Sequence, residues 1–314
     1  MTLLRGLAQL FAWGASAGLA AIGLAGLSGV GHRWIDILAQ FTAPAAAGAG
    51  LLVLACLGLR LWSAAAAASL AGLILLVAVW PQLAPDRRPA EGPTLRLYTA
   101  NLYGRNDDVA AMRASLQAAD ADVLVLIELG DAPSEQIDAL LEGWPHRAVS
   151  GRRVGAGGAV RSVIASRLPL RPHALTLHEV ETVSATVQAP FGPVEVIAVH
   201  LTRPWPFQFQ WGQIIQVMEL GEHRRTLNGP IIAAGDFNSV STARIGRQMR
   251  DELGLTAAPG WPGTWPAKAP GPLRINIDQV YRSPELVVTE RRLGRPTGSD
   301  HRPVVTELRL RAGG

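Results

Sequence analysis

Acidic, amide and imidazole side chains in this 314-residue chain stand directly after runs of apolar residues, where a β-strand would end. Glu128 follows residues 123–127, and Asp236 follows residues 231–235. Because rigid strands hold the residues at their ends in fixed positions, such ends commonly present functional groups. The sequence therefore predicts a polar site at strand ends and the loops beside them. The candidates that follow a predicted strand are Asn101, Glu128, His200 and Asp236, with Asn238 in the loop after Asp236, whereas Asp278 lies inside a strand and Asp300 and His301 precede the last one.

The residue types of this set indicate a metal-assisted hydrolytic site. A buried, unpaired carboxylate is costly, so several carboxylates at one sheet edge favour a bound cation. Oxygen ligands without a Cys or His cluster point to Mg²⁺, Mn²⁺ or Ca²⁺ rather than Zn²⁺, and His200 and His301 are far apart in the sequence. The alternative for Asp236 and Asn238 is an ordinary turn, which both residue types favour.

From residue 94 onward the apolar pattern predicts an α/β domain. Helices are expected at residues 107–119, with an N-cap at Asn106 or Asp107, and at about 207–227. The pattern favours sheets of mixed strand direction with outer helices. Strands are expected at residues 95–99, 123–127, 162–165, 182–188, 194–199, 231–234, 277–281 and 304–309.

The first 85 residues predict a transmembrane region. Three stretches of spanning length lack charged residues, namely Arg5 to Arg33, Asp36 to Arg60 and Leu61 to Pro85 between their bounds. A cleaved signal peptide would have one such segment and then a polar chain. We therefore expect three membrane helices in residues 1–85, a Pro-rich linker at 86–93 and a catalytic domain at 94–314.

Charge and cysteine content constrain the remaining properties only weakly. All 29 basic residues except Lys268 are Arg, a bias that makes the pI of 9.9 poor evidence for nucleic-acid binding. A single cysteine, Cys56, excludes a disulfide within the chain. The positive-inside rule does not decide the orientation; the short first segment with Arg5 favours an inside N-terminus and hence an extracytoplasmic catalytic domain.

Seven short motifs, in this order, resemble the endonuclease/exonuclease/phosphatase superfamily over residues 94–311. GDFNS at 235–239 and SDHRPV at 299–304 are the most specific, and their combination with a strand-terminal Glu128 is characteristic. The membrane segments and Gly263–Pro266 resemble the membrane-bound bacterial branch of that superfamily. The remaining five of the seven motifs are Thr99-Ala100-Asn101, Ile127-Glu128, Ser166-Arg167, Val199-His200-Leu201 and Ile277-Asp278-Gln279-Val280.

The resemblance implies a four-layer α/β/β/α sandwich (DNase I-like), preceded here by the three-helix transmembrane region, with the site at one edge of two packed sheets. It implies Mg²⁺ as cofactor, with Mn²⁺ as the alternative. Glu128 would be the principal metal ligand, and Asn101 and Asp300 would complete the metal site directly or through water. Tyr103 departs from members that carry an acid there, which argues against a second metal at that position.

The resemblance also implies roles for the remaining candidates. Asp236 would orient and deprotonate the attacking water, and Asn238 would donate hydrogen bonds to the phosphoryl group. His301 would stabilise the phosphoryl oxygens, with Asp278 holding its orientation. His200 would contact the phosphate or protonate the leaving oxygen.

The leading hypothesis is a membrane-anchored, divalent-metal-dependent phosphoesterase that cleaves a phosphodiester or phosphomonoester by in-line attack of an activated water. Its substrate, a nucleic acid or a phospholipid headgroup, stays open, and its expected location is a bacterial inner membrane, with the lipid bilayer as partner and no protein partner predicted. The rival is a catalytically silent membrane scaffold. The aromatic residues Trp205, Phe207, Phe209 and Trp211 after His200 have core packing as their default interpretation and a membrane-facing or substrate-stacking loop as the alternative.

Overall fold

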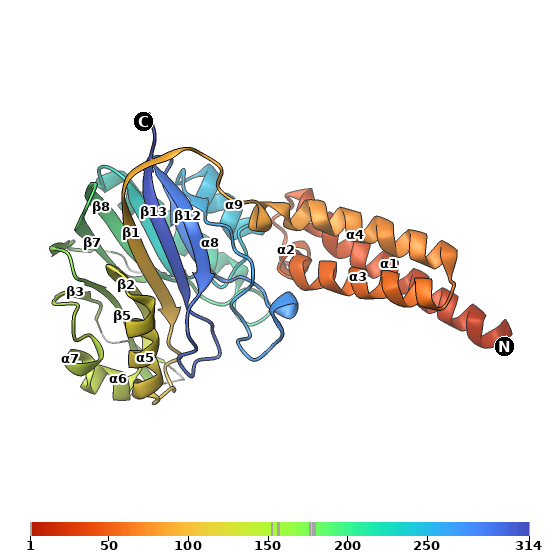
Figure 1. Cartoon of the computed structure of the whole chain (residues 1–314), viewed down its shortest axis with the longest axis horizontal. Helices are drawn as coiled ribbons and strands as arrows, with labels where there is room; N and C mark the ends of the chain where they lie inside the picture. Colours follow the sequence, from red (N-terminus) through yellow and green to blue (C-terminus); the bar gives the residue numbers. More distant parts are fainter. Residues whose placement is uncertain (1, 152, 156–157, 176, 178–179, 314) are drawn as a thin grey trace.

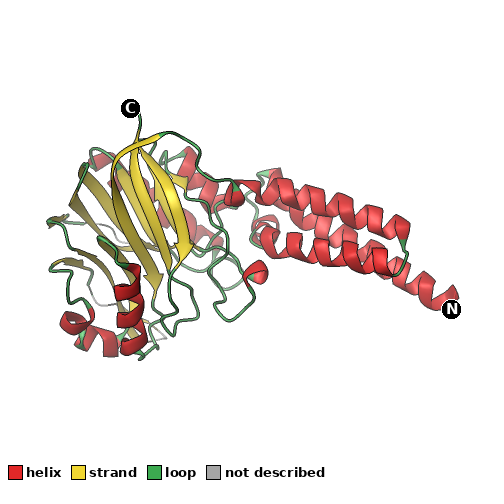
Figure 2. Ribbon diagram, in the orientation of Figure 1, coloured by secondary structure: helices red, strands yellow, loops and turns green. Residues whose placement is uncertain are grey.

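The computed structural model describes residues 2–313, except for residues 152, 156–157, 176 and 178–179. It has two parts: a bundle of helices that carries the N-terminus and a β-sandwich that carries the C-terminus (Figure 1). The helices project from one side of the sandwich, and the strands form two stacked sheets (Figure 2).

The N-terminal bundle contains α1 (Thr2–Ser28), α2 (Arg33–Ala39), α3 (Thr42–Gly58) and α4 (Trp62–Leu83). Helix α4 packs against both α1 and α3, and α2 lies where the bundle meets the sandwich (Figure 1). Small side chains make this close packing possible: Ala49, Ala64 and Ala68 are completely buried.

Among the described residues, two helices, α1 and α4, are long and apolar enough to cross a membrane. They correspond to the first and third predicted spans. The second predicted span is broken into α2 and α3, which meet at 60° and count as a third crossing only if the bent pair is taken together. Helix α3 alone has 17 residues, or about 25 Å, which is at the lower limit for a crossing.

The first sheet of the sandwich has the strand order β12-β13-β1-β2-β5-β3, with β4 paired to β5. Strands β1 and β2 are parallel, and the other neighbours are antiparallel. The bounds are β1 Ala90–Asn101, β2 Val123–Leu129, β3 His146–Val149, β4 Arg153–Gly155, β5 Gly158–Ser166, β12 Leu286–Leu293 and β13 Val304–Arg311.

The second sheet has the order β10-β11-β9-β8-β7-β6. Its central pair, β8 and β9, is parallel, so both strands end at the same edge. The bounds are β6 Leu170–Pro172, β7 Glu181–Ala189, β8 Gly192–His200, β9 Ile231–Asp236, β10 Thr256–Ala257 and β11 Asp278–Arg282.

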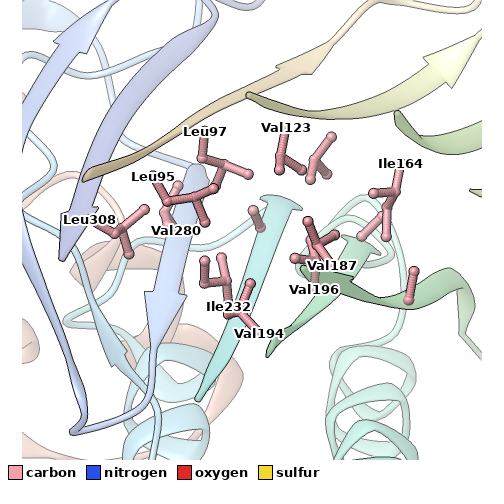
Figure 3. Packing of buried hydrophobic residues seen from close by; sticks show 14 of the residues in the cluster. Leu95, Leu97, Val123, Ile164, Val187, Val194, Val196, Ile232, Val280 and Leu308 are labelled. Carbon is pink, nitrogen blue, oxygen red and sulfur yellow. The ribbon is translucent and has the colours of Figure 1, made fainter. Parts of the chain in front are cut away.

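The two sheets pack face to face around one hydrophobic core (Figure 3). Leu97 and Val123 from the first sheet meet Val196 and Ile232 from the second, and all four are buried. The outer face of the first sheet is covered by α5 (Val109–Ala119), α6 (Asp131–Glu135) and α7 (Ile137–Leu140), and that of the second by α8 (Gln210–Thr226) and α9 (Arg244–Asp251). The predicted four-layer α/β/β/α sandwich is thereby confirmed.

The helix cap before α5 and the predicted linker show how the structure refines the sequence boundaries. The cap of α5 is Asp108, one residue after the position near Asn106 or Asp107 that the sequence indicates, and its side chain accepts a hydrogen bond from the backbone of Ala111. Strand β1 begins at Ala90, inside the predicted linker. Within that linker Asp86 is also held, by Arg282 at 2.7 Å and Arg88 at 2.8 Å.

Candidate active site

Three strands of the second sheet place three candidate side chains next to one another. In the strand register His200 of β8 stands beside Asp236 of β9, and Asp278 of β11 stands on its other side. Directly paired residues project from the same face of a sheet. Ala234, two residues before Asp236, lies in the core between the sheets, so strand alternation turns the side chain of Asp236 towards the first sheet.

Gly235 allows this close strand pairing. It has a φ of 140°, and a Cβ on it would lie 2.0 Å from the carbonyl oxygen of Val199 on β8. A side chain at this position would push β9 away from β8. The glycine of the GDFNS motif therefore serves the backbone, whereas Asp236 supplies the chemistry.

Asn101, the last residue of β1, joins the two sheets at this edge. Its Nδ2 lies 3.0 Å from Glu128 Oε1 and 3.0 Å from Asp236 Oδ2, and its Oδ1 accepts a hydrogen bond from the backbone N–H of Tyr103. The amide nitrogen thus faces the two carboxylates in this arrangement. A metal-ligand role for Asn101 would require the amide to turn so that its oxygen faces them instead.

Glu128 reaches the site through a break in strand alternation. Leu124 and Leu126 of the same strand face outwards, and simple alternation would place Glu128 on that outer face as well. The backbone of Glu128 has a φ of 54°, and the pairing of β2 with β5 shifts register between Leu126 and Leu129. This β-bulge turns the carboxylate inwards; a left-handed conformation of a non-glycine residue costs about 1–2 kcal/mol.

The inward carboxylate of Glu128 is held by His200 and by backbone. His200 Nε2 lies 3.3 Å from Oε1, and the N–H of Gly104 donates to Oε2 at 3.2 Å. Burial raises the pKa of Glu128, but the charge of His200 and the hydrogen bonds from Asn101 and Gly104 outweigh it and hold the pKa below its ordinary value. Glu128 is therefore an ionised acceptor at neutral pH.

His301 and Asp278 form a buried pair. Asp278 Oδ2 lies 2.9 Å from His301 Nδ1, and the hydroxyl of Ser299 accepts the backbone N–H of His301 while donating to the carbonyl of Asn101. Burial lowers the pKa of His301, but the charge of Asp278 and its hydrogen bond prevail and raise the pKa to about 10. The imidazole is thus a fixed cation whose Nε2 lies 4.0 Å from Asp236 Oδ2.

Asp236 differs from Glu128 in the direction in which its pKa is shifted. It is almost completely buried, and burial raises its pKa to about 6, against the opposing charge of His301 and with the support of Asp278. A carboxylate with a pKa just below neutral pH is ionised and still accepts a proton readily. Asn238, with a φ of 48°, donates its backbone N–H to Asp236 Oδ1 at 2.8 Å and its amide to the carbonyl of Leu201 at 2.9 Å.

Asp300 stands apart from the other candidates. Its side chain is half exposed, and Oδ2 accepts a hydrogen bond from the indole of Trp265 at 3.2 Å. Oδ1 lies 4.0 Å from His301 Nε2. The structure therefore brings seven of the eight predicted residues together and leaves Asp300 at the margin of the cluster.

The donor set fits a divalent cation. Among the described residues two groups place ligand atoms within 4.8 Å of one another: Glu128, His200 and Asp236, and Asp236, Asp278 and His301. The Asp278–His301 pair is neutral overall, so the carboxylates of Glu128 and Asp236 face only the imidazole of His200 at this edge. Carboxylate oxygens in excess of positive charge suit Mg²⁺ or Mn²⁺. The first group includes the predicted ligand Glu128, and neither group includes Asp300.

Two glutamines of the N-terminal bundle hold the segment that follows Asp236. Gln40, between α2 and α3, accepts the backbone N–H of Val240 at 2.8 Å and donates to the hydroxyl of Ser239 at 3.2 Å. Gln82 of α4 donates to the hydroxyl of Thr242 at 2.9 Å. The sequence offers only one signal for this pair of contacts, which is a glutamine inside an otherwise apolar stretch.

The comparisons with known proteins agree with the fold. A sequence profile of the endonuclease/exonuclease/phosphatase family matches residues 98–301, more than half of the chain. None of the curated proteins compared by sequence matches it.

Among solved structures, an endonuclease/exonuclease/phosphatase from Beutenbergia cavernae is similar with a TM-score of 0.55 and 23% identity over 71% of this chain and 72% of that chain. One from Bacteroides vulgatus has a TM-score of 0.56 and 14% identity, over 70% of this chain and 100% of that chain. Sphingomyelinase C from Streptomyces griseocarneus has a TM-score of 0.51 and 14% identity, over 69% of this chain and 99% of that chain. At these identities the structures support the fold.

Proposed function

Because this chain belongs to the endonuclease/exonuclease/phosphatase family, we propose that it is a membrane-anchored, divalent-metal-dependent hydrolase of a phosphodiester or phosphomonoester. The observation that carries this proposal is the position of Asp236. It is buried between the carboxylate-bearing edge of the first sheet and the His301–Asp278 pair, and its pKa is raised to about 6.

In the proposed reaction Asp236 orients a water molecule and removes one of its protons. The water oxygen forms a bond to phosphorus, and the bond from phosphorus to the leaving oxygen breaks in line with it. The cationic His301, held by Asp278, stabilises the negative charge on the phosphoryl oxygens. His200, which faces Glu128, protonates the leaving oxygen, so that an alcohol and a phosphate ester or phosphate are the products.

The metal site of the proposal consists of Glu128 as principal ligand, with Asn101 and Asp300 binding directly or through water. A bound Mg²⁺ or Mn²⁺ supplies Lewis-acid stabilisation of the phosphoryl oxygens. The marginal position of Asp300 and the amide orientation of Asn101 favour participation through water for both. Asn238, whose amide donates to Leu201 and lies 3.3 Å from Asp236, reaches a phosphoryl oxygen only by exchanging one of these partners.

The proposed location is a bacterial inner membrane, crossed several times by the N-terminal helices, with the catalytic domain on the extracytoplasmic side. Helices α1 and α4 support membrane association through their length and composition. A reporter fused after Gly314 tests the side: activity of an alkaline phosphatase fusion supports the proposal, and activity of a cytoplasmic reporter contradicts it.

The full-length protein in detergent is expected to hydrolyse bis-p-nitrophenyl phosphate or p-nitrophenyl phosphate with Mg²⁺ or Mn²⁺ and to lose this activity with EDTA. Asp236→Asn and His301→Ala are each expected to lower kcat by at least about two orders of magnitude. Asp107→Asn and His146→Ala, outside the cluster, are the matched controls. Near-normal turnover in the first two variants would refute the assigned roles, and an inactive wild type with every metal and ester would support the silent scaffold.

A further inference from the structure

The loop after β8 and the first turn of α8 expose three large aromatic side chains to solvent. Phe207, Phe209 and Trp211 are 70%, 83% and 62% exposed, so core packing, the default interpretation of their sequence, is wrong for them. Water-exposed aromatic side chains at consecutive alternate positions are unusual on a soluble surface. We call these three residues the aromatic ridge.

The ridge is fixed to the end of the N-terminal bundle. Trp205, at the start of the same loop, packs against Trp34 with ring centroids 4.1 Å apart, and the guanidinium of Arg33 lies 5.7 Å from the same ring. Gln210, between Phe209 and Trp211, donates to the carbonyl of Gly31 at 2.9 Å. The ridge therefore sits at the level where α1 ends.

That level has the composition of a membrane interface. Trp34, Phe41 and Trp80 lie near the ends of helices that face the sandwich, and they are 56%, 42% and 59% exposed. Tryptophan and other aromatic residues collect where helices leave the hydrocarbon core. The aromatic ridge continues this belt from the helices onto the catalytic domain.

The ridge is also tied closely to the catalytic cluster. Phe207 is seven residues after His200, so the two Cα atoms are separated by at most about 25 Å. A ridge lodged among lipid headgroups would therefore keep His200 and its neighbours within one such distance of the membrane surface.

We propose that the aromatic ridge inserts into the headgroup region of the same bilayer that takes up α1 and α4, and that the substrate is a phosphoester in a lipid headgroup of that bilayer. The substrate half of this proposal rests on the proposed hydrolase function, whereas the insertion half does not. The ridge then has two effects. It holds the active site at a fixed height over the membrane, and at that height the phosphoesters that the site can reach are those of lipid headgroups.

Insertion is measured on the full chain with a fluorescent label. Cys56 is the only cysteine, so Cys56→Ala combined with Phe209→Cys allows a single environment-sensitive label on the ridge. A label at Ala139→Cys, exposed on α7 far from the bundle, is the control (Figure 1). In vesicles of phosphatidylethanolamine and phosphatidylglycerol with brominated acyl chains, we expect a blue shift and quenching at position 209 only. Equal exposure of both labels to water, in protein whose helices are inserted, overturns the proposal.

The substrate half is measured as a ratio of two activities of the same preparation. Phe207→Gln, Phe209→Gln and Trp211→Gln are combined in one variant and reconstituted in vesicles of phosphatidylethanolamine, phosphatidylglycerol and phosphatidic acid. We expect the turnover of vesicle phospholipid, relative to that of bis-p-nitrophenyl phosphate, to fall at least about tenfold. An unchanged ratio, or a wild type that cleaves DNA or RNA but no vesicle phospholipid, contradicts it. If neither ester is cleaved, the proposed function fails while the label still reports on insertion.

Discussion

Replacing Gln40 tests whether the N-terminal bundle supports the segment that follows Asp236. Gln40→Met keeps the length of the side chain and removes both of its hydrogen bonds, one to the N–H of Val240 and one to the hydroxyl of Ser239. All three residues are buried, so water cannot replace the lost partner. A buried donor without a partner costs about 1–3 kcal/mol, and the second lost bond about 1 kcal/mol, which gives about 2–4 kcal/mol in total.

For a folded region of this size 1 kcal/mol corresponds to about 2–4 °C in the unfolding midpoint, so Gln40→Met is expected to lower the midpoint by about 4–16 °C in detergent. Because Val240 is four residues after Asp236, kcat for bis-p-nitrophenyl phosphate is expected to fall about tenfold with little change in KM. The matched control is Gln117→Met, an exposed glutamine on α5.

A double-mutant cycle separates the shared hydrogen bond from a general loss of stability. Ser239→Ala should cost about 0.5–1 kcal/mol less in the Gln40→Met background than in the wild type, because its partner is already absent. Additive costs, or a Gln40→Met midpoint and kcat equal to those of Gln117→Met, would refute the reasoning that the bundle holds this segment in place.

Three further predictions concern the backbone, the pH dependence and the domain boundary. Gly235→Ala is expected to cost about 3 kcal/mol or more and to lower soluble yield, because its φ of 140° and the nearby carbonyl of the next strand exclude a Cβ; Gly151→Ala, which meets nothing within 4 Å, is the control and should express normally. Burial raises the pKa of Asp86, but Arg88 and Arg282 outweigh this effect and hold the pKa far below its ordinary value. The ionised carboxylate therefore stabilises the fold above about pH 4, and this stabilisation is lost as the pH falls further. If the unfolding midpoint of Asp86→Asn declines in acid as steeply as that of the wild type, the prediction is contradicted. A fragment of residues 94–314 lacks Asp86 and both glutamines, and its midpoint should lie below that of the full chain; an equal midpoint would show that the bundle contributes nothing.

Most of the sandwich could be predicted because its strands are buried on both faces or alternate regularly. Residues 123–127 and 231–234 are continuous apolar runs, and both are buried strands of parallel pairs. The polar residue after a strand marks the site for Asn101, Glu128, His200 and Asp236. Asp278 begins β11 and His301 precedes β13, so the motif resemblance was needed to assign their roles. Strand β12 and helix α9 were not predicted, because their many charged residues interrupt the hydrophobic periodicity that identifies strands and helices.

Glu128 shows why the geometry of the site exceeds these rules. Its place in the sequence identifies it as a strand-end acid, yet the alternation of β2 would turn it away from Asp236. Only a left-handed residue and a register shift, neither of which has a local sequence signature here, turn it inwards. Local patterns therefore identified the residue but not the backbone conformation by which it acts, as is expected where function opposes regular structure.

The same reasoning explains the break in the second predicted membrane span. Asp36 and Gln40 are four residues apart at the start of that stretch, so both lie on one side of the chain where α2 ends. Placing a carboxylate and an amide on one side of a helix against lipid costs free energy. Placing them against protein is favourable where backbone N–H groups can donate hydrogen bonds to them. Asp36 accepts the N–H of Arg244 at 2.7 Å, at the first turn of α9, and Gln40 accepts that of Val240. Helix α2 therefore packs with the β-sandwich, which leaves α1, α4 and at most α3 as candidate membrane-spanning helices.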